Sequence, residues 1–206
     1  MEKGKEPEYE GAIVLDPEPG IYLNSAIATL DYASLYPSCI ISENMSHDTI
    51  VLENKWKGEK GGLALRKLGY DYIDIEWDVF RTSGNKKIRT RKETTRFVQS
   101  PDGSKGIIPR ILQNLLVARK KARKKIKYKT VTTKAQKTYS GLYKKRDDAT
   151  IEMTTEDGVI EIPESDIEKV ESTYSDFQQG ILDGLQKAYK ITANSIYGQM
   201  GAKTSP

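Results

Sequence analysis

The sequence has few of the residues that build disulfides, histidine-centred metal sites or membrane spans. One cysteine, Cys39, excludes an internal disulfide and a multi-cysteine zinc site, and one histidine, His47, excludes a histidine cluster. Because Cys39 lies in an apolar run, we expect it to be a buried structural thiol. No apolar run approaches the roughly 20 residues of a membrane-spanning helix, and residues 1–10 are too charged for a signal peptide. We therefore expect a soluble, intracellular protein with no membrane partner.

Hydrophobic residues are also scarce, at 37% of 206 residues, whereas 30% of the residues are charged. This composition favours a molecule with much polar surface over a compact enzyme for a small substrate. The net charge is only +4, but basic residues gather between Arg119 and Lys129. The distribution of charge is therefore more informative about partners than its total.

The first third of the chain predicts strands around one short helix. We expect a hairpin over residues 11–30, whose last strand, Ala26–Leu30, delivers Asp31 at its end. Pro37 suits the first position of a helix that runs to about Glu43 and turns apolar residues inward. A carboxylate at a strand end, followed by free backbone amides, can hold a divalent cation beside a phosphate. The alternative is a plain strand–helix corner with one surface carboxylate.

The next stretch predicts a flexible link and a pair of strands. Residues 58–62 are rich in Gly and Lys and read as a link, and residues 70–80 alternate strictly between two faces. One face would carry Tyr72, Asp74, Glu76 and Asp78, and the other Ile73, Ile75, Trp77 and Val79. The acidic row could be half of a metal site, but it is more typical of the solvated side of a strand. A turn at residues 83–85 leads into a basic returning strand, 86–97.

A long helix is predicted from Ile107, with Pro109 in its first turn. Its apolar stripe consists of Ile108, Ile111, Leu112, Leu115 and Leu116. At 100° per residue, Arg119 and Arg123 continue this inward stripe, so each needs a partner elsewhere in the fold or an anionic ligand.

Residues 130–172 are predicted to be an insertion between two helices, with a hairpin at Asp157–Gly158 and a short acidic helix after Pro163. A last helix is predicted over residues 174–197, and Gly198 would cap it. Its inward face would consist of Ile181, Leu185, Ala188, Thr192 and Ser195. Lys190, Asn194 and Tyr197 would lie on the opposite side.

Three short motifs resemble family B DNA polymerases. Asp31-Tyr-Ala-Ser-Leu-Tyr-Pro-Ser38 matches the first polymerase motif at every fixed position. Lys190-Ile-Thr-Ala-Asn-Ser-Ile-Tyr-Gly198 resembles the Lys-x-x-x-Asn-Ser-x-Tyr-Gly motif, and Tyr9-Glu-Gly-Ala12 is similar to a Tyr-x-Gly-Gly/Ala element. The motifs occur in family order across nearly the whole chain. The insertion and the tail after Tyr197 resemble polymerases of large double-stranded DNA viruses.

The resemblance implies an α/β, more exactly α+β, fold. Residues 1–105 would be a partial palm with an antiparallel sheet, and residues 106–198 an antiparallel pair of fingers helices with the 130–172 insertion. Residues 199–206 would return toward the palm. The last catalytic motif, a Tyr-Gly-Asp-Thr-Asp hairpin, does not occur in the sequence. The chain would then be a fragment that is inactive alone.

The implied reaction adds deoxynucleotides from dNTPs to a primer 3′-hydroxyl with two Mg²⁺ ions. By resemblance, Asp31 is the catalytic carboxylate and metal ligand, and the backbone carbonyl of Tyr32 is a second metal ligand. The residues implied to bind the dNTP are Ser34, Leu35, Tyr36, Arg119, Arg123, Lys190 and Asn194. Arg123 departs from the family, which has Lys at this position. The residues implied to contact DNA are Tyr9, Gly11, Ala12, Tyr197 and Gly198.

The implied partners are primer–template DNA and dNTPs, and a processivity factor is compatible with them. If the protein is viral, the host nucleus or cytoplasm would be its location. One alternative is a non-catalytic DNA-binding scaffold derived from a polymerase, against which the retained Asp31, Lys190 and Asn194 argue. A reverse transcriptase or RNA polymerase is a second alternative, which the Ser34-Leu35-Tyr36 and Asn-Ser-x-Tyr-Gly runs disfavour.

Overall fold

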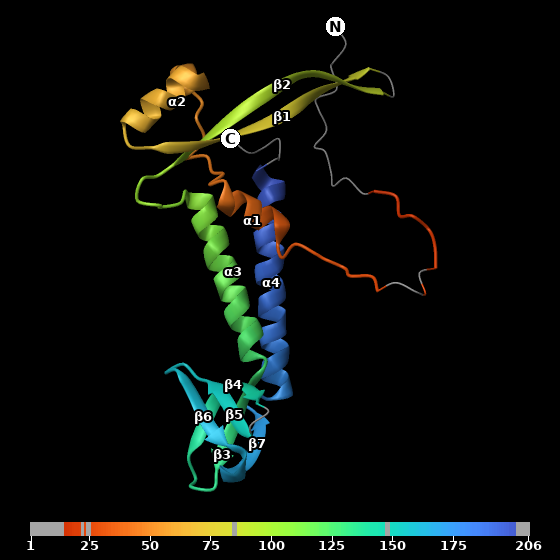
Figure 1. The fold of residues 1–206 in the computed structure, drawn as a ribbon, viewed down its shortest axis with the longest axis vertical. Helices are drawn as coiled ribbons and strands as arrows, with labels where there is room; N and C mark the ends of the chain where they lie inside the picture. The colour runs from red at the N-terminus through yellow and green to blue at the C-terminus, as the bar shows by residue number, and fades with distance from the viewer. Residues whose placement is uncertain (1–14, 22, 24–25, 84–85, 147–148, 201–206) are drawn as a thin grey trace. The chain divides into compact units, whose positions relative to one another are not determined.

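The computed structural model describes residues 15–21, 23, 26–83, 86–146 and 149–200. The described residues up to Arg110, together with those from Tyr197 onward, form one compact unit, and Ile111–Ile196 form a second. Helices and antiparallel strands are both abundant, which confirms the mixed α+β class (Figure 1). None of the described helices is long and apolar enough to cross a membrane.

The segment before the first helix differs from the sequence expectation. Residues 26–32 are neither helix nor strand, and Ile27 and Leu30 are 68% and 94% exposed. The predicted strand Ala26–Leu30 is therefore wrong. A β-strand requires a hydrogen-bonded neighbour, and no described segment pairs with these residues. Most of the first strand of the expected hairpin, residues 11–14, lies outside the described part of the chain.

Helix α1 (Leu35–Ser42) begins two residues earlier than expected. Pro37 is buried in its first turn, where a missing N–H costs no helical hydrogen bond. Pro37 and Ile40 form the buried face of α1, whereas Cys39 points to a different side and is exposed. The expectation of a buried thiol was therefore wrong, because only one narrow face of this short helix is covered.

The Gly/Lys-rich stretch is a helix and not a link. The 3-10 turn η1 (Asn54–Trp56) leads directly into α2 (Gly58–Lys67). A Cβ on Gly61 would collide with the backbone of Trp56, and one on Gly62 would collide with the Tyr72 hydroxyl. Because Gly61 and Gly62 have no side chain, α2 can pack closely against Trp56 and Tyr72. A Gly-rich composition that is typical of a link therefore occurs here in a packed helix.

Strands β1 (Asp71–Ser83) and β2 (Lys86–Gln99) form a long antiparallel ribbon, as the alternation predicted (Figure 1). Asp74 lies opposite Arg96 in this register, and a register shift separates Val79 from Phe80. Residues 49–51 pair with β2 through an isolated antiparallel bridge between Ile50 and Phe97.

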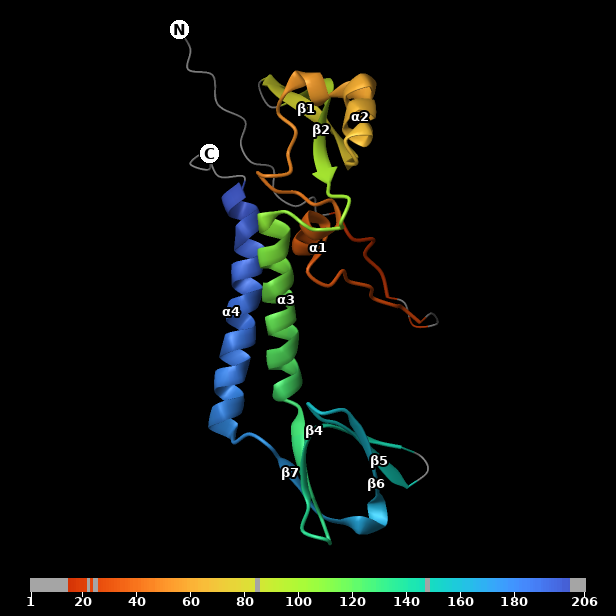
Figure 2. The ribbon, with the colours of Figure 1, turned by 90° about the vertical axis from the view of Figure 1, so that its left-hand side faces the viewer.

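The second unit contains most of two antiparallel helices that lie side by side, α3 (Ile107–Lys125) and α4 (Asp176–Met200) (Figures 1 and 2). Helix α3 begins at Ile107, as predicted. Helix α4 continues through Gly198 to Met200, so the predicted cap at Gly198 was wrong. Lys129 also lies outside the basic helix, in the strand that follows it.

The buried face of α4 is not the predicted one. Residues Ile181 and Leu185 are 55% and 42% exposed, and the rest of the predicted inward face, Ala188, Thr192 and Ser195, is exposed as well. The less exposed line of the helix is instead made of Leu182, Gln186, Tyr189, Ala193 and Ile196. This line includes polar residues because its neighbour α3 offers polar partners, which hydrophobic periodicity does not detect.

Five short strands form a second antiparallel sheet in the order β6-β5-β4-β3-β7. They are β3 (Tyr128–Thr133), β4 (Thr138–Lys145), β5 (Thr150–Thr154), β6 (Val159–Pro163) and β7 (Ile167–Ser172). The predicted hairpin at Asp157–Gly158 is present as β5–β6, and the acidic helix is the 3-10 turn η2 (Glu164–Asp166). The core of this sheet is formed by Val131, Ile151, Met153 and Ile162.

Candidate functional site

The first candidate residues, Asp31 and Tyr32, lie in the irregular segment that enters α1. The side chain of Tyr32 is 78% exposed, and Asp31 is exposed too. A carboxylate and a backbone carbonyl are the oxygen donors that Mg²⁺ prefers, so both residues fit a magnesium site. Within the described residues, however, no group of three or more His, Cys, Asp or Glu side chains could hold a metal. By themselves, Asp31 and Tyr32 could therefore supply only part of a magnesium site.

The turn between Asp31 and α1 exposes backbone amides. Ser34 has a left-handed backbone with φ of 57°, and its carbonyl accepts a hydrogen bond from the Ser38 amide at 3.0 Å. The Ser38 hydroxyl donates to the Ala33 carbonyl at 3.2 Å, which braces the turn. The amides of Leu35 and Tyr36 lie in the first helical turn, where the helix itself offers no acceptor. This arrangement can receive an anionic group such as a phosphate.

Tyr36 and Tyr197 come from two motifs that lie far apart in the sequence. Their rings are stacked with centroids 4.3 Å apart and planes inclined by 8°. Tyr36 remains 40% exposed, so one part of its ring is open to a ligand. The structure thus brings Tyr36 of the first motif and Tyr197 of the last motif together within one compact unit.

A buried polar network fixes α1 relative to the start of α3. Asn44, which is fully buried, donates through Nδ2 to the Val98 carbonyl at 2.9 Å and accepts through Oδ1 from the Gly106 amide at 2.8 Å. The Asp48 carboxylate accepts from the Ile107 amide at 3.2 Å. Burial alone would raise the pKa of Asp48, but hydrogen bonds from Ser46 and from Ile107 outweigh it and lower that pKa.

The remaining dNTP-binding candidates lie in the second unit. Arg119 is half-buried on α3 and donates through Nε to the Gln186 side-chain oxygen of α4 at 3.4 Å. Arg119 therefore has a polar partner within the fold, which was one of the two expected possibilities. Arg123 is exposed, so the prediction that it continues the inward stripe was wrong. The buried line of α3 passes instead through Leu112 and Ala122.

Lys190 and Asn194 are exposed on α4 and follow Gln186 at intervals of four residues. Residues at this spacing lie on one ridge of a helix. Gln186 meets Arg119, and the ridge continues from there along α4. Arg119 thus contacts α4 one helical turn before Lys190.

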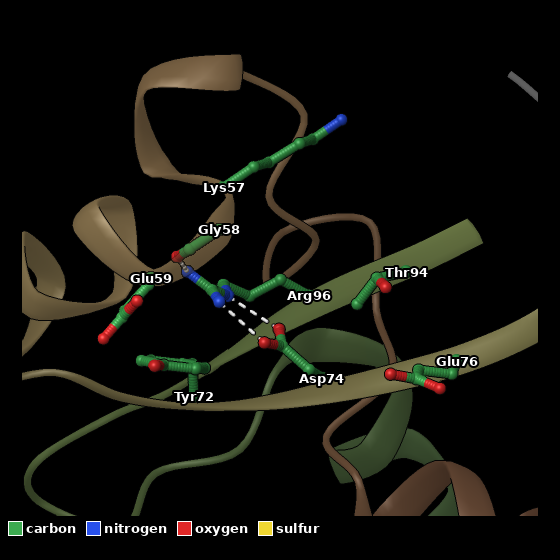
Figure 3. Close-up of a pocket in the computed structure, with 8 residues that line it drawn as sticks. All are labelled: Lys57, Gly58, Glu59, Tyr72, Asp74, Glu76, Thr94 and Arg96. Atoms are coloured by element: carbon green, nitrogen blue, oxygen red, sulfur yellow. Dashed lines mark hydrogen bonds and ion pairs between the residues drawn. The ribbon is translucent and has the colours of Figure 1, made fainter. Parts of the chain in front are cut away.

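A cleft of about 450 Å³ lies elsewhere, at the base of the β1–β2 ribbon (Figure 3). It is lined by Lys57, Gly58, Glu59, Tyr72, Asp74, Glu76, Thr94 and Arg96. None of the motif residues that the structure describes lines this cleft. We place the candidate site at the motif residues, because the central side chain of the cleft is already engaged by its own chain.

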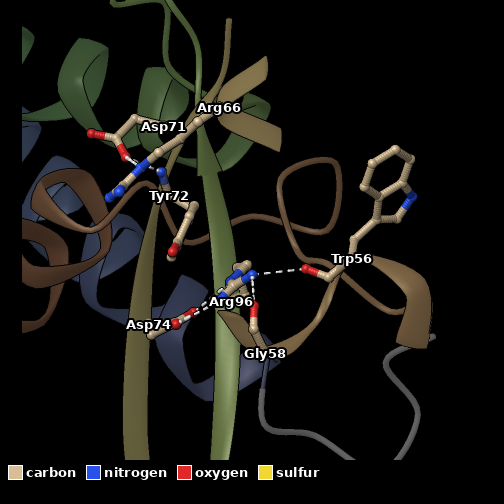
Figure 4. Close-up of polar contacts among 7 residues, drawn as sticks. All are labelled: Trp56, Gly58, Arg66, Asp71, Tyr72, Asp74 and Arg96. Atoms are coloured by element: carbon tan, nitrogen blue, oxygen red, sulfur yellow. Dashed lines mark hydrogen bonds and ion pairs between the residues drawn. The ribbon is translucent and has the colours of Figure 1, made fainter. Parts of the chain in front are cut away.

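That central side chain is Arg96, which is 4% exposed (Figure 4). Its guanidinium donates to both Asp74 oxygens at 2.7 and 2.6 Å. It also donates to the carbonyls of Trp56 and Gly58 at 2.8 and 2.9 Å, and it lies 3.8 Å from the Tyr72 ring centre. The hydrogen bonds from Arg96 lower the pKa of Asp74. Arg96 therefore joins η1 and α2 to the ribbon.

The other expected site residues are distributed over both units. Tyr9, Gly11 and Ala12 lie outside the described residues, and Gly198 is exposed within α4. Asp31, Ser34, Leu35, Tyr36 and Tyr197 belong to the first unit, and Arg119, Arg123, Lys190 and Asn194 to the second.

Sequence reasoning missed the supporting residues Asn44, Asp48 and Gln186. Asn44 accepts a hydrogen bond from the Gly106 amide, and Asp48 accepts one from the Ile107 amide. Each partner lies about 60 residues away in the sequence, so no local pattern could reveal these contacts. Gln186 had a weak signal, because it precedes Lys190 by one helical turn. The Asp74–Arg96 pair had a stronger signal in the sequence, because an acidic strand is followed by a basic strand that pairs with it.

Comparisons with known proteins identify the family of the chain. A sequence model of DNA polymerase family B matches residues 1–145 and 167–206. The chain is 48% identical to a DNA polymerase of Pyramimonas orientalis virus over 198 residues, and 32% identical to one of Phaeocystis pouchetii virus over 216 residues. Each alignment covers 96% of this chain and 16% of the viral protein.

A cellular relative is more distant. The chain is 29% identical over 201 residues to the DNA polymerase delta catalytic subunit of Drosophila melanogaster, with 98% of this chain and 12% of that protein aligned. No solved structure matches the chain. The chain thus spans about one sixth of the length of its viral relatives, and the match extends over nearly all of its own length.

Proposed function

Because the chain belongs to DNA polymerase family B, we propose that it is a palm and fingers fragment of a longer, template-directed DNA polymerase. The complete protein adds deoxynucleotides from dNTPs to a primer 3′-hydroxyl during DNA replication. Residues 1–105 form part of the palm, residues 106–198 the fingers, and residues 199–206 the return toward the palm.

One observation carries this proposal most directly. The stacked rings of Tyr36 and Tyr197 unite two motifs that a polymerase needs at a single nucleotide site. Sequence similarity alone would be compatible with a decayed relative in which the motifs survive but no longer meet. The 4.3 Å stack supports a retained site, with Tyr36 beneath the sugar of the incoming nucleotide. There its ring excludes a ribose 2′-hydroxyl, which favours deoxynucleotides.

Asp31 is the proposed catalytic carboxylate. Its exposed side chain and the Tyr32 carbonyl would hold Mg²⁺, which lowers the pKa of an attacking hydroxyl and screens negative charge on phosphate. The chemistry of two ions needs a second carboxylate, which we propose comes from another part of the complete protein.

The triphosphate is proposed to lie against two sets of donors. The amides of Ser34, Leu35 and Tyr36 face the β- and γ-phosphates from the start of α1. Arg119, Arg123 and Lys190 neutralise the charge that grows on the leaving group, and the Asn194 amide donates a hydrogen bond to it. Arg119 is held ready by Gln186, which limits the reorganisation needed when the nucleotide binds.

Primer–template DNA is the proposed macromolecular partner. Tyr197 and Gly198 line the minor-groove side of the new base pair, and Tyr9, Gly11 and Ala12 contact the template. A processivity factor is a further proposed partner, and a viral protein would act in the nucleus or cytoplasm of its host.

The experiment is primer extension by the complete polymerase with Asp31→Asn. We expect kcat to fall by several orders of magnitude with little change in DNA affinity, since the metal-binding charge is lost but the surface is kept. The matched control is Asp16→Asn, which removes an exposed carboxylate from the same irregular segment. The 206 residues alone should extend no primer. Unchanged extension by Asp31→Asn would contradict the assignment, and DNA binding without extension by the unmodified protein would indicate a scaffold.

A further inference from the structure

The three parts of the second unit differ in their balance of charge. Residues 111–127, which are the part of α3 in this unit and the turn after it, contain seven basic residues and no acidic one. In the strands that follow, residues 128–146 and 149–172 together contain seven basic and eight acidic residues. In α4, residues 176–196 contain two of each. Uncompensated positive charge is therefore concentrated on α3.

Basic residues of the sheet and of α4 take part in ion pairs within the unit. Lys145 of the sheet pairs with Glu164 at 2.6 Å, and Lys187 of α4 pairs with Asp183 at 2.6 Å. Between the residues that the structure describes, no lysine from position 120 to position 127 forms an ion pair. The charge of α3 is thus left for a partner outside this unit.

Four of these lysines share one exposed surface of the molecule. This surface, which we call the lysine face, consists of Lys120, Lys121, Lys124 and Lys127. All four residues are exposed. At 100° per residue, the three that lie on the helix point away from the buried Leu112 and Ala122. Lys127 follows in a tight turn, in which its amide donates to the Lys124 carbonyl at 2.9 Å.

A lysine at the end of a helix has a simpler explanation, because the carbonyl end of a helix attracts cations. That attraction is confined to the last turn of the helix. Lys120 and Lys121 precede the helix end at Lys125 by more than one turn, so the attraction does not account for them. The lysine face is also separate from the proposed nucleotide site, because Arg119 lies on the other side of α3 and donates to Gln186 of α4.

Aromatic side chains gather at the same end of the helix pair. Helix α3 ends next to the start of α4, beside the five-stranded sheet (Figures 1 and 2). Tyr128, which follows α3, stacks on Tyr174 with ring centres 6.5 Å apart. Phe177, in the first turn of α4, is 78% exposed. An exposed ring can stack on an unpaired base, whereas the bases of a duplex are already stacked on one another.

From these features we propose that the lysine face and Phe177 bind single-stranded DNA, namely the template strand ahead of the primer end. The inference rests on the proposed function, because a template-directed polymerase has an unpaired template strand beyond its primer. The lysines neutralise phosphates, and the ring of Phe177 stacks on a base. Both contacts are independent of sequence, since every nucleotide has a phosphate and a base with an aromatic face.

The test measures the affinity of the complete polymerase for two labelled primer–templates by fluorescence anisotropy at several salt concentrations. One substrate has a long single-stranded template overhang, and the other is the same duplex without an overhang. The lysine-face variant combines Lys120→Gln, Lys121→Gln and Lys124→Gln. The matched control combines Lys134→Gln, Lys137→Gln and Lys144→Gln, which removes equal charge from exposed positions of the balanced sheet and its turn. A third variant replaces the same three lysines of α3 by Arg and keeps the charge.

We expect the lysine-face variant to bind the overhang substrate more weakly and with less dependence on salt. Each lost phosphate contact to a single strand reduces the slope of log Kd against log salt by about 0.7, so three reduce it by about 2.1. Affinity for the duplex without an overhang should be unchanged. The sheet control and the arginine variant should bind both substrates like the unmodified protein. At saturating DNA, kcat for single-nucleotide addition should be unchanged in all three variants.

Phe177 is tested separately with the overhang substrate. Phe177→Ala should weaken binding by about tenfold, which is the scale of one lost base stack. Phe177→Tyr keeps an aromatic ring and should retain the affinity of the unmodified protein. Unchanged affinity in Phe177→Ala would overturn the role of the ring.

Three results would overturn the role of the lysine face. They are an unmodified Kd and slope in the lysine-face variant, an equal loss of affinity for the duplex without an overhang, and an equal loss in the sheet control. A photo-crosslinking residue at Val117, which is 54% exposed and precedes Lys120 by three residues, should capture the overhang. Capture of a protein subunit instead would also overturn the inference. Failure of the proposed function is recognised separately, because it appears as absent primer extension by the unmodified polymerase, whatever the anisotropy shows.

Discussion

The motif-bearing segment and the five-stranded sheet are built in opposite ways. Residues 26–33 contain no helix or strand, and Leu30 and Tyr32 are 94% and 78% exposed. In the sheet, Val131 and Met153 are fully buried in a common apolar core. The segment with the proposed catalytic residue has little packing, and the sheet with the best packing has no polymerase motif.

This difference separates two kinds of requirement. A catalytic carboxylate must stay accessible to substrate, so it cannot be covered by its own chain. An inserted sheet must remain folded at the end of two long helices, so it needs a core of its own. Substitutions in the first segment should therefore change activity with little effect on stability, and substitutions in the sheet should do the reverse.

The largest effect on stability is expected from Met153→Ala. Removal of a fully buried Met side chain leaves a cavity and should cost about 2–5 kcal/mol in the free energy of unfolding of the sheet. Hydrogen exchange of β3–β5 measures this destabilisation, and Val159→Ala, at a 62% exposed position on an edge strand, is the control. Similar destabilisation in both variants would show that the buried cluster does not carry the stability of the sheet.

Lys190→Ala tests the other side of the comparison. We expect kcat/KM for the dNTP to fall by about 10²–10³, the scale of removing one donor to a developing charge. The melting temperature should hardly change, since Lys190 is exposed. Lys187→Ala is the control, because Lys187 is a neighbouring lysine that pairs with Asp183 at 2.6 Å. Weaker template affinity with an unchanged KM for nucleotide would reassign Lys190 to DNA binding.

Tyr36→Ala should relax sugar selection by about 10²-fold, the discrimination that exclusion of one hydroxyl can supply. Ribonucleotide incorporation should rise while deoxynucleotide addition is largely kept. Tyr36→Phe keeps the ring and its stack on Tyr197, so it should retain selection. Competition between dNTP and rNTP in single-turnover extension measures the ratio. Equal loss of activity with dNTP and with rNTP would show that Tyr36 only stabilises the turn into α1 by packing.

Acid should weaken the first unit more than the sheet. The pKa of Asp74 is lowered by Arg96 in the folded protein, so its stabilising effect is present above the unfolded pKa of about 3.9 and is lost as the pH falls through the folded value. Both tryptophans, Trp56 and Trp77, belong to this unit, so urea titrations followed by tryptophan fluorescence report on it alone. Asp74→Asn should flatten the profile below about pH 5, although Asp48 leaves a residual dependence. An unchanged profile in Asp74→Asn would contradict the role of the Arg96 pair.

The smallest effect is expected when residues 130–172 are replaced by a short turn that contains Gly. Lys129 and Ser172 are paired across β3 and β7, so a tight turn can join the remaining ends. Single-nucleotide addition should stay within about tenfold, which is about 1.4 kcal/mol of activation free energy. Collapse of extension in a folded replacement variant would show that the sheet takes part in catalysis.

Several features were predictable because their signals are local. The strict alternation of residues 70–80 predicted β1, Pro109 marked the first turn of α3, and Asp157–Gly158 predicted the β5–β6 turn. The family was predictable for another reason, since the residues and spacing within Asp31–Ser38 and Lys190–Gly198 match motifs of family B DNA polymerases. Each of these signals involves residues within a few positions of one another.

Other features depended on partners that lie far away in the sequence. The predicted strand Ala26–Leu30 did not form because nothing in the described chain pairs with it, and glycines 61 and 62 belong to a helix because Trp56 and Tyr72 pack against them. The less exposed side of helix α4 includes Gln186 and not Ile181, because α3 presents Arg119 at that point.

The sequence by itself therefore determined the family to which the chain belongs, the alternation of β1 and the start of α3. Only the tertiary structure decided which faces are buried and which motif residues meet, above all the stack of Tyr36 on Tyr197. The physical reason is that propensity and spacing act between near neighbours, whereas burial and hydrogen-bond satisfaction depend on the surface that another segment supplies.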